Sequence, residues 1–157
     1  MFLIELILIL AWAFSGLQIE SYTSKTSKGI HVVPSYGPFS LRIGESTCVK
    51  GQRGVFATAA FTKGDVVEKC PCVLVSSELS LGRFDDYTFD AGEDLQGLAF
   101  GYGYMYNHSK KPNVEFDYDS ETNTKTYTAL RDIQPGEELF SSYGSGWWKG
   151  RKGFASC

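Results

Sequence analysis

The stretch YMYNHSKKPNVEF, residues 104–116, decides how the rest of the chain is interpreted. It combines three aromatic side chains with one of the chain's two histidines, and its Asn-His-Ser run is closed by Lys-Lys-Pro-Asn. On these residues alone, Asn107 and His108 form a reactive pair, a metal site, or a turn between two strands whose polar groups are satisfied internally. Motifs elsewhere in the sequence are needed to decide among these interpretations.

The composition indicates a globular chain of one domain. Its 157 residues are 43% hydrophobic and 15% aromatic, and its 17 glycines favour strands and turns over a helical bundle. The net charge is −3, with acidic and basic residues interspersed. Such a chain offers no basic footprint for a phosphate backbone, so direct binding of nucleic acid is not expected, whereas a basic peptide partner is compatible with it.

Short runs rich in Val, Phe, Tyr and Thr predict a mainly-β domain. In residues 114–119 the alternation is clean, with Val114, Phe116 and Tyr118 on one face and three carboxylates on the other, which we interpret as a solvated face. A polar loop then turns the chain into the next strand, which predicts a hairpin. The predicted strands cover residues 40–43, 54–58, 65–70, 73–76, 86–90, 114–119, 125–130 and 137–143.

The four cysteines are Cys48, Cys70, Cys72 and Cys157. Cys70 and Cys72 flank Pro71 in an apolar run, which predicts two short strands broken at the proline and a buried pair of thiols. A zinc site needs about four closely spaced ligands, so no metal is expected. The spacing of the four does not resemble a disulfide framework, which favours free thiols and a reducing compartment.

The N-terminus favours a different compartment. Residues 1–14 are apolar except for Glu5, a length that suits a signal segment or a buried helix better than a membrane span. A secretory route or membrane attachment through this leader therefore stays open beside an intracellular location. A polar linker from Ser21 follows, so we expect leader and linker in residues 1–28 and the folded domain in residues 29–157.

Three motifs together resemble the SET-domain protein-lysine methyltransferases. They are GQRGVFATAAFTKGDVVEK at residues 51–69, YNHSKKPN at 106–113 and LRDIQPGEELFSSYG at 130–144, and the resemblance runs from about Arg42 to Trp148. It is to the small single-domain members of bacteria and large viruses. The resemblance implies small curved sheets, few short helices, and a C-terminal segment threaded beneath the Asn-His loop in a pseudoknot.

The resemblance also implies S-adenosyl-L-methionine as cofactor and assigns residues to it. Asn107 and His108 match a cofactor clamp, so His108 is not expected to act as a general base. Gln52 stands where the family pattern has glycine, which puts backbone access there in doubt. The other implied cofactor contacts are the main chain of Arg53, Gly54 and Val55, and the ring of Trp148 or its neighbour Trp147 against the adenine.

The implied reaction is methyl transfer to the ε-amine of a lysine in a protein or peptide. Tyr143 matches the family tyrosine at the site of methyl transfer, and Tyr87 matches a tyrosine that borders the lysine channel. Ser141 stands in that channel where the family has tyrosine or phenylalanine. Two alternatives stay open: a catalytically silent SET-like binding module, and a secreted or membrane-tethered β domain without a cofactor.

Overall fold

The computed structural model describes residues 23–26, 29–32, 40–149, 151 and 157, and the chain divides into two compact units, residues 1–35 and 36–157. In the first unit, β1 (Thr23–Thr26) and β2 (Gly29–Val32) form an antiparallel hairpin. The stretch expected to be a linker therefore contains a strand, and it pairs with the segment that begins at Gly29. The leader, residues 1–14, lies outside the described residues.

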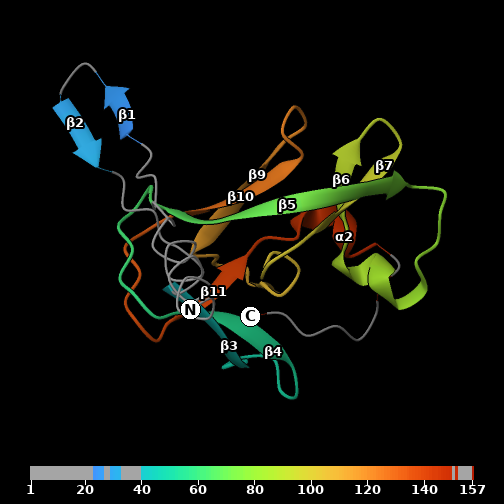
Figure 1. Cartoon of the computed structure of the whole chain (residues 1–157). Coiled ribbons are helices and arrows are strands. Elements are labelled where there is room, and N and C mark those ends of the chain that lie inside the picture. The colour runs from blue at the N-terminus through green and yellow to red at the C-terminus, as the bar shows by residue number, and fades with distance from the viewer. Residues whose placement is uncertain (1–22, 27–28, 33–39, 150, 152–156) are drawn as a thin grey trace, which may run out of the picture. The chain divides into compact units, whose positions relative to one another are not determined.

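The second unit contains a sheet of five strands in the order β6-β7-β5-β10-β9. The long strand β5 (Val66–Ser76) pairs through its first half with β10 (Thr124–Ala129) and through its second half with β7 (Leu95–Ala99). β5, green in Figure 1, therefore connects the β10–β9 pair at one end of the sheet to the β7–β6 pair at the other. The outer strands are β6 (Phe89–Gly92) and β9 (Val114–Asp119).

The predicted break at Pro71 is wrong, because β5 runs through it without interruption. Pro71 faces Thr124 of β10, and the pairing with β7 starts one residue later, at Cys72. Proline interrupts a sheet because it lacks a backbone N–H donor. At the point where one partner strand gives way to another, that missing donor removes little pairing.

A second sheet of four strands has the order β3-β4-β11-β8. β3 (Leu41–Glu45) and β11 (Glu138–Ser141) pair antiparallel with β4 (Arg53–Ala57), whereas β11 pairs parallel with β8 (Asn107–His108). Beyond it, the Cys157 N–H donates to the His108 carbonyl and the Lys110 N–H donates to the Cys157 carbonyl. The Asn-His segment therefore lies beside β11 and is also hydrogen-bonded to the C-terminal residue Cys157.

Two short helices complete the described part of this unit: the 3₁₀ helix η2 (Gly82–Tyr87) and α2 (Gly144–Trp147). The strand predicted at residues 86–90 is half wrong, because Asp86 and Tyr87 belong to η2 and β6 starts only at Phe89. The Asp85 carboxylate accepts the Leu81 N–H and the Ser80 hydroxyl and so stabilises the helical turn.

The core lies between these sheets, and the fold is mainly β, as expected from the sequence. The predicted hairpin is β9–β10, in which Thr124 pairs with Asp119. On β9, Val114 is fully buried and Phe116 packs against the core, whereas the three carboxylates are exposed. The largest fully buried hydrophobic side chains are Tyr127, Phe61, Ile133, Leu139, Val55, Val67 and Val114.

The cysteines correct one prediction. Cys70 is buried and Cys72 half-buried, and both are free, as expected. Cys48 and Cys157, however, form a disulfide across 109 residues of sequence. The fold brings these two together by laying the C-terminal residue against β8, a proximity that cysteine spacing does not reveal. The expectation that the cysteines form no disulfide is therefore wrong.

Candidate active site

A cavity of about 1540 Å³ opens between the two sheets and the short helices of the second unit. Its wall combines residues from the loop before β4, from η2 and β6, from β8 and β11, and from α2. Among the described residues, no group of three or more His, Cys, Asp or Glu side chains is placed to hold a metal ion. The sequence-predicted residues in the wall are Tyr87, Asn107, His108, Ser141, Tyr143 and Trp147.

A buried carboxylate, Glu138, organises one end of the cavity. Its residue is 4% exposed, and one of its oxygens accepts both the N–H and the hydroxyl of Thr47 at 2.6 Å. Its other oxygen accepts the Asn107 side-chain amide at 2.9 Å. That same amide donates to the Arg53 carbonyl at 3.0 Å, so one carboxylate ties the loop before β4, β4 and β8 together.

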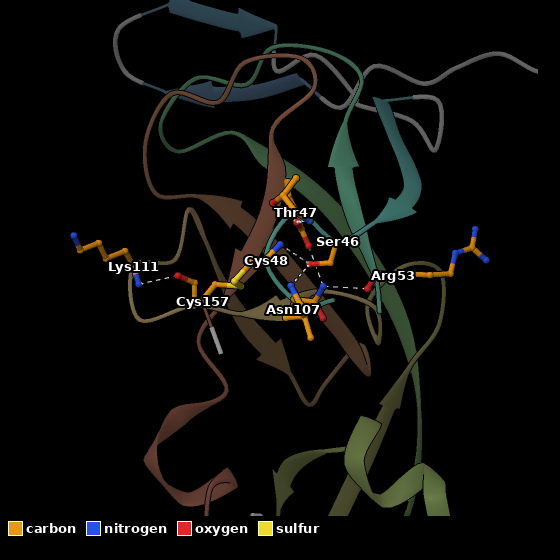
Figure 2. The surroundings of a disulfide bond; sticks show 10 residues. Ser46, Thr47, Cys48, Arg53, Asn107, Lys111 and Cys157 are labelled. Carbon is orange, nitrogen blue, oxygen red and sulfur yellow. Dashed lines mark hydrogen bonds between the residues drawn. A yellow bond between two sulfur atoms is a disulfide. The ribbon is translucent and has the colours of Figure 1, made fainter. Parts of the chain in front are cut away.

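Gly54 is required by this arrangement. A Cβ on Gly54 would overlap the inner Glu138 oxygen and would lie 2.9 Å from the Asn107 amide nitrogen. The missing side chain lets the β4 backbone approach the carboxylate directly. Figure 2 shows the result at Arg53, whose carbonyl faces Asn107 while its guanidinium extends away from it. The main chain of Arg53, and not its side chain, belongs to the site.

The remaining predicted cofactor residues are placed differently from one another. Val55 is completely buried in the core, between Ile43 and Leu139 in the strand register. Gln52, the departure from the family pattern, lines the cavity, and so does Lys50, which the sequence did not single out. Trp147 also lines the cavity. Trp148 is not among the residues that line the cavity, and it lies edge-on to the His108 ring, with ring centroids 4.8 Å apart.

His108 is held as a neutral ring. Its Nδ1 accepts the Tyr143 backbone N–H at 3.1 Å, which places the ring proton on Nε2. Burial lowers the pKa of His108 below its usual value, and the Lys110 charge lowers it further. Because Nδ1 accepts the Tyr143 N–H, the imidazole ring holds the backbone of Tyr143 in place.

Tyr143 directs its hydroxyl into the site. The hydroxyl donates to the Tyr106 carbonyl at 2.8 Å, and burial together with the neighbouring Tyr87 raises the pKa of Tyr143 to about 12. The phenol therefore stays protonated at any physiological pH. Behind it, the Tyr106 hydroxyl donates to the Glu68 carboxylate, which also accepts the Tyr102 N–H. The side chain of the residue whose carbonyl receives Tyr143 is thus held by Glu68.

Tyr87 and Ser141 face the cavity from different elements. Tyr87, at the end of η2, is 46% exposed and lies edge-on to Tyr104 at 6.1 Å between ring centroids. Ser141 is 2% exposed and ends β11 beside the pairing with His108. Tyr87 therefore borders the mouth of the cavity, whereas Ser141 belongs to its buried wall.

Arg151 closes the cavity from the C-terminal side. Its guanidinium forms an ion pair with Asp86 at 2.8 Å, donates to the carbonyls of Trp147 and Asp85, and lies 4.6 Å from the centroid of the Trp147 ring. These contacts hold η2 against α2, two elements about sixty residues apart. One arginine thereby connects the helix that carries Tyr87 to the segment that follows Tyr143.

Sequence reasoning missed several of these residues. Glu138 lies in a Gly-Glu-Glu-Leu run, and nothing in that run distinguishes it from its half-buried neighbour Glu137. Glu138 is buried because β11 lies between β4 and β8, a pairing of distant segments that the sequence does not show. No sequence signal marks Thr47, Arg151 or the Tyr106 carbonyl as part of the site.

Comparisons with known proteins assign the family. A family model, the SET domain, matches residues 52–144. The chain belongs to the SET-domain family. It is similar in structure to a candidate histone methyltransferase of Plasmodium falciparum, at 32% sequence identity and a TM-score of 0.60, over 69% of this chain and 96% of that one. None of the curated proteins compared by sequence matches the chain significantly.

Two larger assemblies share the fold of this SET domain. One is an active polycomb repressive complex 2 in the basal state, at 24% identity and a TM-score of 0.59. The other is a polycomb repressive complex 2 in an autoinhibited conformation bound to S-adenosylmethionine, at 23% identity and a TM-score of 0.56. The matched region covers 67% of this chain and 15% of each matched chain. The family and its structural relatives support methyl transfer as the general activity.

Proposed function

We infer that this SET domain transfers a methyl group from S-adenosyl-L-methionine to the ε-amine of a lysine in a protein or peptide. The observation that carries the proposal is the convergence, on one cavity, of the Glu138–Asn107 network and the Tyr143 hydroxyl. The Glu138–Asn107 network places polar groups close to the backbone of the site. The Tyr143 hydroxyl is a neutral donor held against the Tyr106 carbonyl. Both lie inside the region that matches the family model.

The residues present fit the cofactor. The cavity exceeds the 300–1,000 Å³ of common small-molecule sites, which leaves room for a cofactor and a side chain together. Gly54 lets Glu138 and Asn107 pack directly against the β4 backbone, the polar side chains of Gln52 and Lys50 lie in the wall, and Trp147 offers a ring for stacking. When bound, S-adenosylmethionine supplies an electrophilic methyl group on a positively charged sulfur.

The chain's own residues have to supply a neutral lysine amine. A free lysine has a pKa of about 10.4, so its ammonium must be disfavoured in the site. Desolvation does this, because burial penalises the charged form. The cavity wall contains the aromatic residues Tyr87, Tyr106, Phe116, Tyr127 and Tyr143.

Tyr143 and Tyr106 then position the amine. The Tyr143 hydroxyl is oriented by the Tyr106 carbonyl, and the His108 ring holds the Tyr143 backbone. A fixed hydroxyl and a fixed carbonyl can aim the amine lone pair, which is catalysis by orientation and preorganised electrostatics. No side chain in this arrangement has to remove a proton as a strong base.

The test combines binding with turnover. Calorimetry of the full chain with S-adenosylmethionine in the presence of a chelator should give binding, and Asn107→Ala should weaken it by about 1–3 kcal/mol because a buried polar partner is lost. A lysine-centred peptide array with methyl-labelled cofactor should give labelled peptides. Binding without any labelled peptide would favour a catalytically silent module.

A further inference from the structure

Lys125 is a buried cation that the proposed mechanism has not used. It lies on the inward face of β10, is 6% exposed, and lines the same cavity as Tyr143. Among the described residues, no carboxylate forms an ion pair with its ammonium group and no hydrogen bond to that group is present. Lysine is almost never buried without a partner, so this position requires an explanation.

Aromatic rings take the place of a carboxylate around Lys125. Its Nζ lies 3.7 Å from the ring centroid of Phe116, 4.4 Å from that of Phe89 and 5.3 Å from that of Tyr127. Ring faces attract a cation, and the attraction grows when the pair is desolvated. The three rings therefore stabilise a positive charge without neutralising it.

The titratable groups around Lys125 do not neutralise it either. β5 contributes the thiols of Cys70 and Cys72, β10 contributes the Tyr127 phenol, and β9 contributes Tyr118 as the register partner of Lys125. The Glu68 carboxylate of β5 is engaged by Tyr102 and Tyr106. Burial lowers the pKa of Lys125 to about 8, so the group is charged at neutral pH.

A continuous path of rings connects Lys125 to the reacting end of the cavity. Tyr127 stacks on Tyr106, with ring centroids 4.0 Å apart and planes 9° from parallel. Tyr106 carries the carbonyl that receives the Tyr143 hydroxyl. The Lys125 charge thus lies in a low-dielectric wall, separated from the methyl-transfer end by two packed aromatic residues.

We propose that the Lys125 ammonium is an electrostatic positioning group that favours the neutral, nucleophilic form of the target lysine bound in this cavity. The inference rests on the proposed lysine methylation. Two ammonium groups in one desolvated cavity repel each other, so the pair holds one proton more readily than two. The bound target amine would lie beside the positively charged sulfur of the cofactor, which lowers its pKa below that of Lys125. Below about pH 8 the shared proton therefore stays on Lys125, and the target lysine releases its own proton to water on binding.

The effect has a predictable size. Two unit charges roughly 10 Å apart in a medium of effective dielectric constant about 20 shift each other's ionisation by about one pKa unit. Because kcat depends on ionisation within the enzyme–substrate complex, the shift belongs in the pH profile of kcat. The profile of kcat/KM follows the free lysine of the peptide instead.

Lys125→Met removes the charge and keeps the volume, and Lys125→Arg keeps the charge. With the most strongly labelled peptide of the lysine array as substrate, Lys125→Met should move the midpoint of the kcat profile up by about one pH unit. Its kcat at pH 7.5 should therefore fall roughly tenfold and should recover at high pH. Lys125→Arg should keep the wild-type midpoint. Coincident midpoints for wild type and Lys125→Met would overturn the inference.

Binding provides a readout that does not need turnover. Calorimetry of the same peptide in buffers of different ionisation enthalpy should detect proton release on binding to the wild type, and less release on binding to Lys125→Met. A peptide with norleucine in place of the target lysine should release no proton to either protein. Equal release from both proteins with the lysine peptide would contradict the inference.

Stability separates a structural role from an electrostatic one. Replacing a buried charge by an apolar side chain of similar size is commonly neutral or stabilising, so Lys125→Met should unfold at a temperature equal to or above that of the wild type. A variant that fails to fold would show that Lys125 is structural and would overturn the inference. If the wild type methylates no peptide, the proposed function is wrong. If the wild type is active and the kcat profile of Lys125→Met has the same midpoint, only the inference about Lys125 is wrong.

Discussion

Glu138→Gln tests the carboxylate that holds Thr47 and Asn107 in the site, because it replaces one carboxylate oxygen by an amide nitrogen. The carboxylate accepts three donors, two from Thr47 and one from Asn107, and its residue is 4% exposed. A glutamine can keep its oxygen toward Thr47, but its amide nitrogen then faces the Asn107 nitrogen, which is itself a donor. One charge-assisted hydrogen bond is lost and one buried donor remains without an acceptor.

The expected cost is about 2–4 kcal/mol in the free energy of unfolding. The adjacent residue provides a matched control, because Glu137→Gln makes the same chemical change in an exposed ion pair with Arg131. That pair joins side chains that are 54% and 31% exposed, so its loss should cost at most about 1 kcal/mol. Urea unfolding of the two variants side by side measures the difference.

Binding of S-adenosylmethionine should separate the same two variants. Glu138→Gln disturbs the amide of Asn107 and the loop that carries Gln52, so its affinity should fall at least severalfold, whereas Glu137→Gln should bind as the wild type does. If the two variants unfold at the same urea concentration and bind alike, Glu138 does not organise the site.

Four further predictions follow from the same geometry. Replacing Cys48 and Cys157 by serine should lower the free energy of unfolding by about 2–5 kcal/mol, since the disulfide closes a loop of more than 100 residues, and guanidinium unfolding measures it. Tyr143→Phe should remove most turnover and leave cofactor affinity within a few-fold, which paired kinetics and calorimetry check. Acid should destabilise the fold through His108: its pKa is lower when folded than unfolded, so stability falls as pH drops through about 6.5, as urea unfolding across pH would record. Because Ser141 is small, the product should carry more than one methyl group, which mass spectrometry at long reaction times reveals.

Each of these has a result that would contradict it. Unchanged stability after reduction of the wild type would exclude a stabilising disulfide, and full activity of Tyr143→Phe would remove the hydroxyl from the reaction. For His108, a pKa at or above that of an unfolded histidine, measured by NMR, would reverse the sign of the expected pH effect. A product that stalls at one methyl group with cofactor in excess would show that the Ser141 hydroxyl, and not its small volume, governs the channel.

The sequence predicts the fold well where the signal is local. The β9–β10 hairpin follows from clean alternation and a polar turn, and the family follows from three motifs in order. The error at Pro71 has a physical cause, because a proline breaks a strand only where a ladder hydrogen bond would otherwise form. Sequence alone does not show that Pro71 lies where the partners of β5 change.

The parts of the site that could not be predicted depend on contacts between distant segments. Thr47 and Glu138 are 91 residues apart, and the cysteines of the disulfide are 109 residues apart. Both pairs are set by the passage of β11 and the C-terminus beside β8. Lys125 illustrates the same limit, since a lysine in an alternating strand predicts a solvated face until the rings that cover it are known.

The most direct test of the central claim is mass spectrometry of a lysine peptide after incubation with the full chain and methyl-deuterated S-adenosylmethionine. The peptide is the strongest of the lysine-centred array, and its partner has arginine in place of the central lysine. We predict that fragmentation places the labelled methyl group on the ε-amine of the central lysine, and that Tyr143→Phe leaves the peptide unmodified. A label on the arginine peptide, or none on any peptide despite measurable binding of the cofactor, would contradict lysine methylation by this SET domain.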